Sequence, residues 1–275
     1  MLKYLENVDK LNSVLNLLSD DTSKQIYFEA VKYRLTYWIS RMEPALRPSY
    51  SNNVPKYPIP LLDGPAEMIK RSVKQVYFNS QYEIPGIVEV KKGDTVIDAG
   101  AFYGDSALYF ESAVSPGGIV YAFEPNHKIA NILNENIKNN NRLNITVIEK
   151  GLSDQSSFAK LSDNEEISMI VDDEKHNISD KYLEIKTTTI DEFVTERDIK
   201  HVNFIKMDIE GHENSAIKGS VHVLQKFQPK LAISIYHRYF DFYDLPLLIN
   251  NINPNYKMYI RHATYNWSDT ILFCI

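Results

Sequence analysis

The sequence is poor in several features that define large classes of protein. Its 275 residues include a single cysteine, Cys274, which excludes an intramolecular disulfide and a cysteine-ligated metal cluster and favours a reducing compartment. No apolar run approaches the roughly 20 residues needed to cross a bilayer. Charges interrupt the first segment, MLKYLENVDKLNSVL, too often for a signal peptide. These absences predict a cytoplasmic protein.

An excess of positive charge is also missing. The formal net charge is -6, and the Lys and Arg residues are scattered among acidic ones without forming a stripe. A surface that tracks nucleic acid, or a polybasic membrane patch, would need such a stripe. The expected partners are therefore small molecules or other proteins, with no nucleic acid and no membrane insertion.

Residues 1–80 are predicted to form a helical cap followed by a Pro-rich connector. Apolar residues recur at helical spacing over residues 2–18 and again over about 23–42. Six of the 12 prolines fall within residues 44–65, which breaks regular structure before a further helix over roughly 66–79. The amphipathic helices of the cap suit either closure over an acceptor or a homodimer contact.

From Asp94 onward, short β-branched runs alternate with helical stretches, which is typical of βαβ units in a parallel sheet. The strand-like runs are TVIDAG, IVYAFE, ITVIEKG, VNFIKMD and LAISIYH. The last two runs, KMYIRHA and TILFCI, are too close together for a crossover helix and predict an antiparallel hairpin at the sheet edge.

These patterns predict an α/β, Rossmann-like domain over residues 81–275, with a mostly parallel sheet and the antiparallel C-terminal hairpin. The polar stretch 151–189 is predicted to be an insertion, with short strands near 158–161, 168–171 and 182–188. In an open parallel sheet, ligands bind beyond the carboxyl ends of the strands. The candidate site residues are therefore those that directly follow each run.

The turn after the first run, VIDAGAFYGDS, has the features of a cofactor-binding loop. Gly100 and Gly104 allow a sharp turn and a close approach of a ligand, and Asp98 ends the strand where its carboxylate accepts hydrogen bonds. The dinucleotide fingerprint G-x-G-x-x-G would need glycines where Phe102 and Asp105 stand, so a nicotinamide-dependent oxidoreductase is disfavoured. An acid in the turn suits the amine-bearing methionine portion of S-adenosylmethionine.

The next two strand ends supply further candidate cofactor contacts. The run IVYAFEPN places Glu124 26 positions after Asp98, where a carboxylate can accept both hydroxyls of an unphosphorylated ribose. After the third run, GLSD presents Ser153 and Asp154, and this aspartate can accept a hydrogen bond from an adenine amino group. The purely structural alternatives are a helix-starting acid for Glu124 and a turn for the Ser-Asp pair.

In this order and spacing, GDTVIDAGAFYGDSALYF, VYAFEPN, GLSD and FIKMDIEGHE resemble the FkbM family of S-adenosylmethionine-dependent methyltransferases, over roughly residues 93–237. The resemblance implies a class I methyltransferase fold and methylation of hydroxyl oxygens on sugars or other small metabolites. The family commonly has Gly-Ala-Asn in the first turn, whereas this chain has Gly100, Ala101, Phe102 and Tyr103. Ala101 and Tyr103 are thus expected at the cofactor, and the aromatic pair is expected to shape the pocket.

The segment FIKMDIEGHEN concentrates titratable side chains behind a buried strand. Asp208 follows the strand, and Gly211 permits a tight turn into a helix that begins near Glu213. The run LAISIYH ends in His237, and neighbouring parallel strands lie about 4.8 Å apart, so Asp208 and His237 are expected to reach one point. Methylation of an alcohol needs a positioned acceptor and removal of its proton. His237 is predicted to be the general base, with Asp208 orienting it or binding the substrate. Glu210 is also expected at the reacting centre, and Asp208 is expected to contact the cofactor as well.

Other uses of the same side chains stay open. Asp208, Glu210 and His237 can instead ligate a divalent ion such as magnesium, which would lower the pKa of the acceptor hydroxyl. His212 and Glu213 resemble the start of a zinc H-E-x-x-H helix, but the second histidine of that motif is missing, so both are interpreted as helix-start residues.

The leading hypothesis is an S-adenosylmethionine-dependent O-methyltransferase that acts on a sugar or sugar-like small molecule, such as a nucleotide-linked sugar of a surface polysaccharide or a natural product. Two alternatives remain at this stage. One is a non-catalytic module that only binds S-adenosylmethionine, and the other is a methyltransferase that acts on an amine or a carboxyl group, because a donor site does not reveal the acceptor atom.

Overall fold

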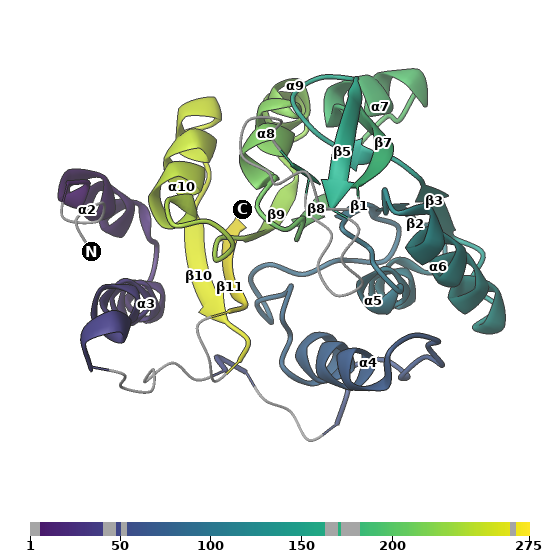
Figure 1. The fold of residues 1–275 in the computed structure, drawn as a ribbon, viewed down its shortest axis with the longest axis horizontal. Coiled ribbons are helices and arrows are strands. Elements are labelled where there is room, and N and C mark those ends of the chain that lie inside the picture. The colour runs from purple at the N-terminus through teal and green to yellow at the C-terminus, as the bar shows by residue number, and fades with distance from the viewer. Residues whose placement is uncertain (1–5, 41–47, 51–53, 163–169, 172–181, 265–267) are drawn as a thin grey trace.

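The structure is a computed structural model and describes residues 6–40, 48–50, 54–162, 170–171, 182–264 and 268–275 (Figure 1). Its main sheet has seven strands in the order β10-β11-β9-β8-β1-β2-β3. The strands are β1 Thr95–Ala99, β2 Ile119–Phe123, β3 Ile145–Ile148, β8 Phe204–Met207, β9 Lys230–Ser234, β10 Met258–His262 and β11 Thr270–Cys274. The first five pair in parallel, and β11 pairs antiparallel with both β9 and β10. The predicted parallel sheet with an antiparallel C-terminal hairpin is confirmed.

Helices cover both faces of this sheet because its side chains alternate between two apolar cores. Ile97 and Ala99 of β1 belong to the core formed with α7, α8, α9 and α10, whereas Val96 faces the core formed with α5 and α6. These helices are α5 Asp105–Val114, α6 His127–Asn139, α7 Ile190–Glu196, α8 Glu213–Lys218, α9 Val221–Lys226 and α10 Asp241–Ile252. The fold is therefore Rossmann-like, with the reversal of strand order at β1.

The two predicted N-terminal helices are present as α2 Val8–Leu17 and α3 Asp21–Ser40. They lie beside α10 and the edge strand β10, at the opposite side of the molecule from α6 (Figure 1). The amide of Ser19 donates to the carbonyl of Met258, and Arg261 of β10 pairs with Asp20 at 2.6 Å. The two helices thus cover the edge of the sheet. A homodimer contact through them stays a prediction.

The helix predicted near residues 66–79 consists of two parts. α4 spans Ala66–Val73 and continues into a π-helical turn, η1, over Lys74–Phe78. Such turns are rare and occur frequently at functional sites. Across the described segments, no helix combines the length and the apolar character that a bilayer span requires.

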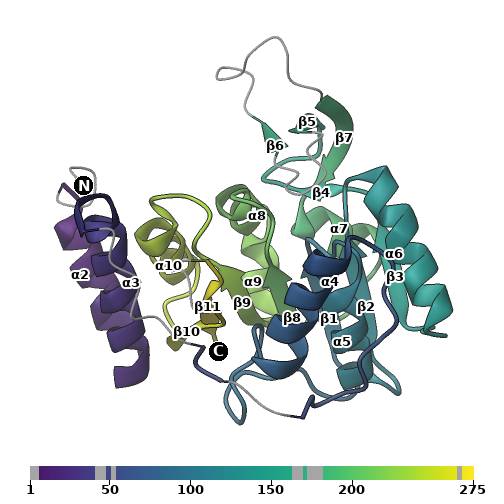
Figure 2. The ribbon, with the colours of Figure 1, turned by 60° about the horizontal axis from the view of Figure 1, so that its bottom comes forward.

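The insertion predicted over residues 151–189 forms a second, smaller sheet in the order β4-β7-β5-β6. Figure 2 shows it projecting from the main sheet, next to α7. Its strands are β4 Gly151–Leu152, β5 Phe158–Ser162, β6 Ile170–Val171 and β7 Tyr182–Thr188. The strands predicted near 158–161 and 182–188 are thus present, and the first half of the one predicted at 168–171 lies outside the described residues.

Candidate active site

A cavity of about 650 Å³ lies over the carboxyl ends of the parallel strands. Its volume falls within the roughly 300–1,000 Å³ that is typical of sites for small ligands. One end, called the Glu124 end, is lined by residues at or beyond the ends of β1, β2 and β3: Phe102, Phe123, Glu124, Ile129 and Leu152. The other, called the Asp269 end, is lined by Arg71, Gln75, Gln81, Ser268 and Asp269. Between the two ends, the wall includes Gly100, Lys206, Asp208, Glu210 and His237.

The turn after β1 forms the floor of the cavity. Gly100 has a φ of +78°, and a Cβ there would lie 1.9 Å from the carbonyl oxygen of Asp208, so a side chain is excluded. Gly104 immediately precedes α5, also with a positive φ. Gly100 and Phe102 line the cavity. Ala101 and Tyr103 are buried within the turn and are not among the lining residues.

Asp98 lies beneath this turn and not on the cavity wall. One carboxylate oxygen is 3.0 Å from the ammonium of Lys206, and the other accepts a hydrogen bond from the hydroxyl of Ser106 at 2.7 Å. Lys206 also donates to the carbonyls of Ala99, at 3.1 Å, and Gly100, at 2.6 Å. Burial lowers the pKa of Lys206, but Asp98 and other carboxylates outweigh it and hold the pKa above its ordinary value. The buried ion pair therefore fixes the turn.

Glu124 follows β2 and faces the cavity. One carboxylate oxygen accepts the N–H of Phe102 at 3.2 Å, and the other accepts the N–H of Asn126 at 2.9 Å. Burial raises the pKa of Glu124 to about 7, against the effect of these two hydrogen bonds. The carboxylate is thus rigidly held beside apolar side chains, with lone pairs still available for a ligand.

Ser153 and Asp154 lie behind the cavity wall, although Leu152 just before them lines it. The Ser153 hydroxyl donates to the Asp154 carboxylate at 3.2 Å and lies 3.0 Å from Nε2 of His212. The structure therefore does not bring these two side chains to the cavity surface.

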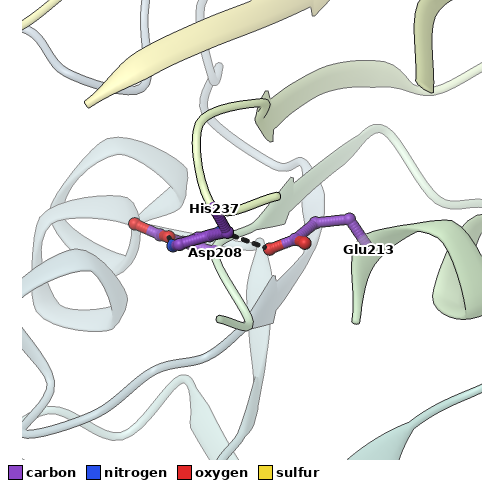
Figure 3. Close-up of side chains that lie close together, drawn as sticks. All are labelled: Asp208, Glu213 and His237. Carbon is purple, nitrogen blue, oxygen red and sulfur yellow. Dashed lines mark hydrogen bonds and ion pairs between the residues drawn. The ribbon is translucent and has the colours of Figure 1, made fainter. Parts of the chain in front are cut away.

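Asp208, Glu210 and His237 meet in the middle of the cavity wall. Nε2 of His237 lies 3.2 Å from Asp208 and 3.5 Å from Glu210, and Nδ1 lies 3.0 Å from Glu213. Figure 3 shows the imidazole ring between Asp208 and Glu213. Asp208 follows β8 directly, as the sequence predicts, whereas His237 lies in the loop three residues beyond Ser234, where β9 ends.

The carboxylates around His237 keep it protonated. Burial lowers the pKa of the imidazole, but Glu213 and Asp208 outweigh burial and raise the pKa well above its ordinary value. Burial raises the pKa of Asp208, but His237 and Lys206 outweigh it, so this pKa lies below the usual range. The raised pKa favours an imidazolium whose Nδ1 is hydrogen-bonded to Glu213, and an imidazolium has no lone pair with which to accept a proton.

A family model described as the FkbM methyltransferase domain matches residues 98–266. The chain belongs to the FkbM methyltransferase family.

Two known relatives agree with this assignment. Hexuronic acid methyltransferase AglP of Haloferax volcanii is 32% identical over 138 residues, which is 50% of this chain and 54% of AglP. The crystal structure of methyltransferase FkbM from Methylobacillus flagellatus KT has the same fold, with a TM-score of 0.70 and 24% identity over 100% of this chain and 60% of that one. The alignment with AglP thus spans about half the length of that curated relative.

Some residues that complete the site of this FkbM-family protein lie outside the matched segment. The hydroxyl of Tyr82 donates to Asp208 at 2.7 Å. Arg34 of α3 donates to the carbonyl of Tyr236 at 2.7 Å and lies 4.4 Å from the ring centroid of Phe242. The Tyr236 hydroxyl in turn donates to Asp208 at 3.2 Å. The N-terminal helices thus support the loop that carries His237, and nothing in the local sequence signals this.

Glu213 and Lys206 make contacts in the site that the sequence interpretation missed. Glu213 does begin α8, but it is also fully buried and accepts hydrogen bonds from His237 and from the N–H of Ile209. The sequence does contain a signal for Lys206, which stands inside the apolar run FIKM. Lysine is almost never fully buried unless it is paired, so a lysine in a buried strand indicates a buried ionic partner.

Glu210 has the most exposed side chain of the four residues in this cluster. Its side chain is 37% exposed and its φ is +54°, a left-handed conformation that costs about 1–3 kcal/mol for a residue other than glycine. Gly211 follows with a φ of +92°. Burial raises the pKa of Glu210 to about 7, partly offset by His237. The strained turn therefore presents a carboxylate that changes protonation state near neutral pH.

Two sets of ligand atoms in this FkbM domain are candidates for a metal ion. Asp208, Glu213 and His237 lie within 4.8 Å of one another, but the two carboxylates face opposite ring nitrogens, and an ion binds only one of these. The set predicted from sequence, Asp208, Glu210 and Nε2 of His237, clusters at one nitrogen. An ion there would compete with the proton that the carboxylates stabilise. The metal set stays a prediction.

Proposed function

We propose that this FkbM-family protein is an S-adenosylmethionine-dependent O-methyltransferase that acts on a hydroxyl of a sugar or sugar-like small molecule. The observation that carries the proposal is a single cavity that joins the buried carboxylate of Glu124 to the cluster of Asp208, Glu210 and His237. The family and the hexuronic acid activity named for AglP support it. The acceptors to test first are nucleotide-linked sugars available in the cytoplasm.

The Glu124 end has the residues that S-adenosylmethionine requires. Each oxygen of Glu124 already holds one backbone N–H, and its remaining lone pairs suit the two ribose hydroxyls. The apolar side chains of Phe123, Ile129 and Leu152 suit an adenine ring. Gly100 leaves the turn open to the methionine portion. When bound, S-adenosylmethionine supplies an electrophilic methyl group on a good leaving group.

The surroundings of the cluster favour Glu210 over His237 as the general base. Both nitrogens of His237 face carboxylates, and Asp208 accepts hydrogen bonds from Tyr82 and Tyr236. Glu210 therefore takes the proton of the acceptor hydroxyl while the oxygen of that hydroxyl forms its new bond to the methyl carbon. Glu210 later releases the proton to solvent. The imidazolium of His237 stabilises the ionised form of Glu210, and the hydrogen bond between Nδ1 and Glu213 fixes the ring.

The cofactor site predicts a specific calorimetric result. At pH 8, above the pKa of Glu124, we expect S-adenosylhomocysteine to bind the wild-type protein and to bind Glu124→Gln about 10- to 100-fold more weakly, because hydrogen bonds to a charged carboxylate contribute about 1.5–3 kcal/mol. Glu196→Gln, an exposed acid on α7, is the matched control and should bind normally. Absence of binding to the wild type would overturn the proposed function, and normal binding to Glu124→Gln would remove Glu124 from the site.

The ion pairs of His237 also predict that divalent metal ions do not change the stability of the protein. We expect dialysis against EDTA, and later addition of magnesium or manganese, to leave the melting temperature unchanged, because the ion pairs of His237 need no cation. The opposite result would be a rise of several degrees on adding an ion that disappears in His237→Gln. That result would establish the metal set at Asp208, Glu210 and Nε2 of His237.

A further inference from the structure

The Asp269 end of the cavity is organised by one buried carboxylate. Asp269 lies in the turn between β10 and β11, is 4% exposed and has a φ of +65°. It accepts hydrogen bonds from the amides of Gln75, at 2.7 Å, and Gln81, at 3.4 Å. The Ser268 hydroxyl donates to it at 2.9 Å, and the Arg71 guanidinium lies at 3.3 Å. A carboxylate with this many donors acts as an anchor that fixes the orientation of its partners.

Asp269 fixes the orientation of two glutamine side-chain amides in the cavity wall. Gln75 and Gln81 are only 7% and 5% exposed, yet both line the cavity. Because each amide gives its NH₂ to Asp269, its oxygen points elsewhere, and no donor among the described residues pairs with either oxygen. Neither oxygen is among the fully buried, unpaired polar atoms of the described residues, so each keeps accessible surface in the cavity that its residue lines. Two fixed acceptors therefore face a cavity from which a ligand can donate to them.

Local backbone structure keeps Gln75 in this position. It lies on the π-helical turn η1, which is joined to α5 by the hydroxyl of Tyr77, a donor to the carbonyl of Asp105 at 3.3 Å. Gln81 directly precedes Tyr82, whose hydroxyl holds Asp208. The two amides are thus connected through short, packed segments to the residues of the reacting centre.

The charges at this end disfavour an anionic group on the acceptor ring itself. Among the described lining residues of the Asp269 end and the middle of the wall, Arg71 pairs with Asp269, His237 pairs with Asp208, and Lys206 pairs with Asp98. Each of these cations already has a carboxylate partner, and burying a further carboxylate without a cation of its own is costly. Arg71 is 59% exposed, so solvent screens its attraction for an anion. Hydroxyl groups carry no such penalty.

We infer that the Asp269 end is the acceptor subsite and that it takes a neutral, polyhydroxylated ring, whose hydroxyls donate to the amide oxygens of Gln75 and Gln81. This inference rests on the proposed function and narrows its substrate. A hexose or deoxyhexose unit meets the requirement, whereas a hexuronic acid, the substrate class in the name of AglP, does not. The ring places a third hydroxyl at Glu210, in the middle of the wall.

The inference is tested by calorimetry on protein saturated with S-adenosylhomocysteine. The probes are the methyl pyranosides of glucose, galactose, mannose and rhamnose, and of glucuronic and galacturonic acids. We expect at least one neutral sugar to bind about tenfold or more tightly than either acid. Binding of an acid as tight as that of the best neutral sugar, or no binding of any sugar, would overturn the inference. Absence of S-adenosylhomocysteine binding would instead overturn the proposed function itself.

Two variants separate recognition by the amides from general loss of structure. Gln75→Leu and Gln81→Leu remove the acceptors at nearly constant size, and each should weaken binding of the neutral sugar about 5- to 10-fold, the value of one hydrogen bond. Affinity for S-adenosylhomocysteine should not change. Gln225→Leu, an exposed glutamine on α9, is the matched control. Unchanged sugar affinity in both variants contradicts the inference. If the leucine variants have a lower melting temperature than the wild type, Gln75→Asn and Gln81→Asn replace them in this test.

Discussion

Replacing Glu210 by glutamine is expected to lower kcat for methyl transfer by about two to four orders of magnitude, the usual contribution of a general base. The amide keeps the size of the side chain but cannot take the proton of the acceptor hydroxyl. Rates are measured with labelled S-adenosylmethionine and a sugar acceptor identified by binding. Affinity for S-adenosylhomocysteine should stay normal, because Glu210 lies outside the Glu124 end.

The pH profile distinguishes Glu210 from His237 as the base. In the wild type, kcat should rise with pH around a midpoint near 7, because the pKa of Glu210 is about 7 and only the ionised carboxylate accepts a proton. His237 lowers this pKa, so His237→Gln should move the midpoint to higher pH. Glu196→Gln should behave as the wild type. If Glu210→Gln retained the wild-type rate and profile, His237 would again be the candidate base.

Replacing Lys206 by methionine is expected to lower the free energy of unfolding by about 3–5 kcal/mol, the typical result of removing one partner of a buried ion pair. The substitution leaves Asp98 fully buried without its cation, and it removes the donor to the carbonyls of Ala99 and Gly100. Urea unfolding measures the loss. Cofactor affinity should fall as well, because those carbonyls belong to the cavity floor.

The partner substitution provides the control for this prediction. Asp98→Asn combined with Lys206→Met removes both charges, so the double variant should lose less stability than the sum of the two single losses. Lys200→Met, at an exposed position, should change stability by less than about 0.5 kcal/mol. A Lys206→Met protein within 1 kcal/mol of the wild type would mean that the buried pair does not hold the turn.

The elements of this fold that could be predicted from sequence are those set by local patterns. Short β-branched runs separated by helical stretches predict the parallel sheet, and the close spacing of the last two runs predicts the hairpin of β10 and β11. The proximity of Asp208 and His237 could be predicted because the two residues follow strands that lie side by side. Each of these inferences uses information within one or two neighbouring elements.

What could not be predicted depends on side-chain direction and on contacts between distant segments. Ser153 and Asp154 follow the right strand, but only Leu152 before them reaches the cavity, and a sequence pattern does not reveal which of three adjacent side chains does so. Glu213 looked like an ordinary helix-start acid because its burial against His237 is invisible in the chain. Arg34 is 202 positions from its acceptor, Tyr236, beyond any local pattern.

The two ends of the cavity are built from different stretches of the chain. Glu124 and its apolar neighbours lie within residues 98–266, the segment that the family model matches, whereas every residue that defines the Asp269 end lies before or after it. The proposed donor site and the proposed acceptor subsite therefore draw on different stretches of the chain. A chimera that keeps residues 98–266 and receives its flanking segments from a relative should transfer the same methyl group to a different molecule, which makes those segments the place to engineer new specificity.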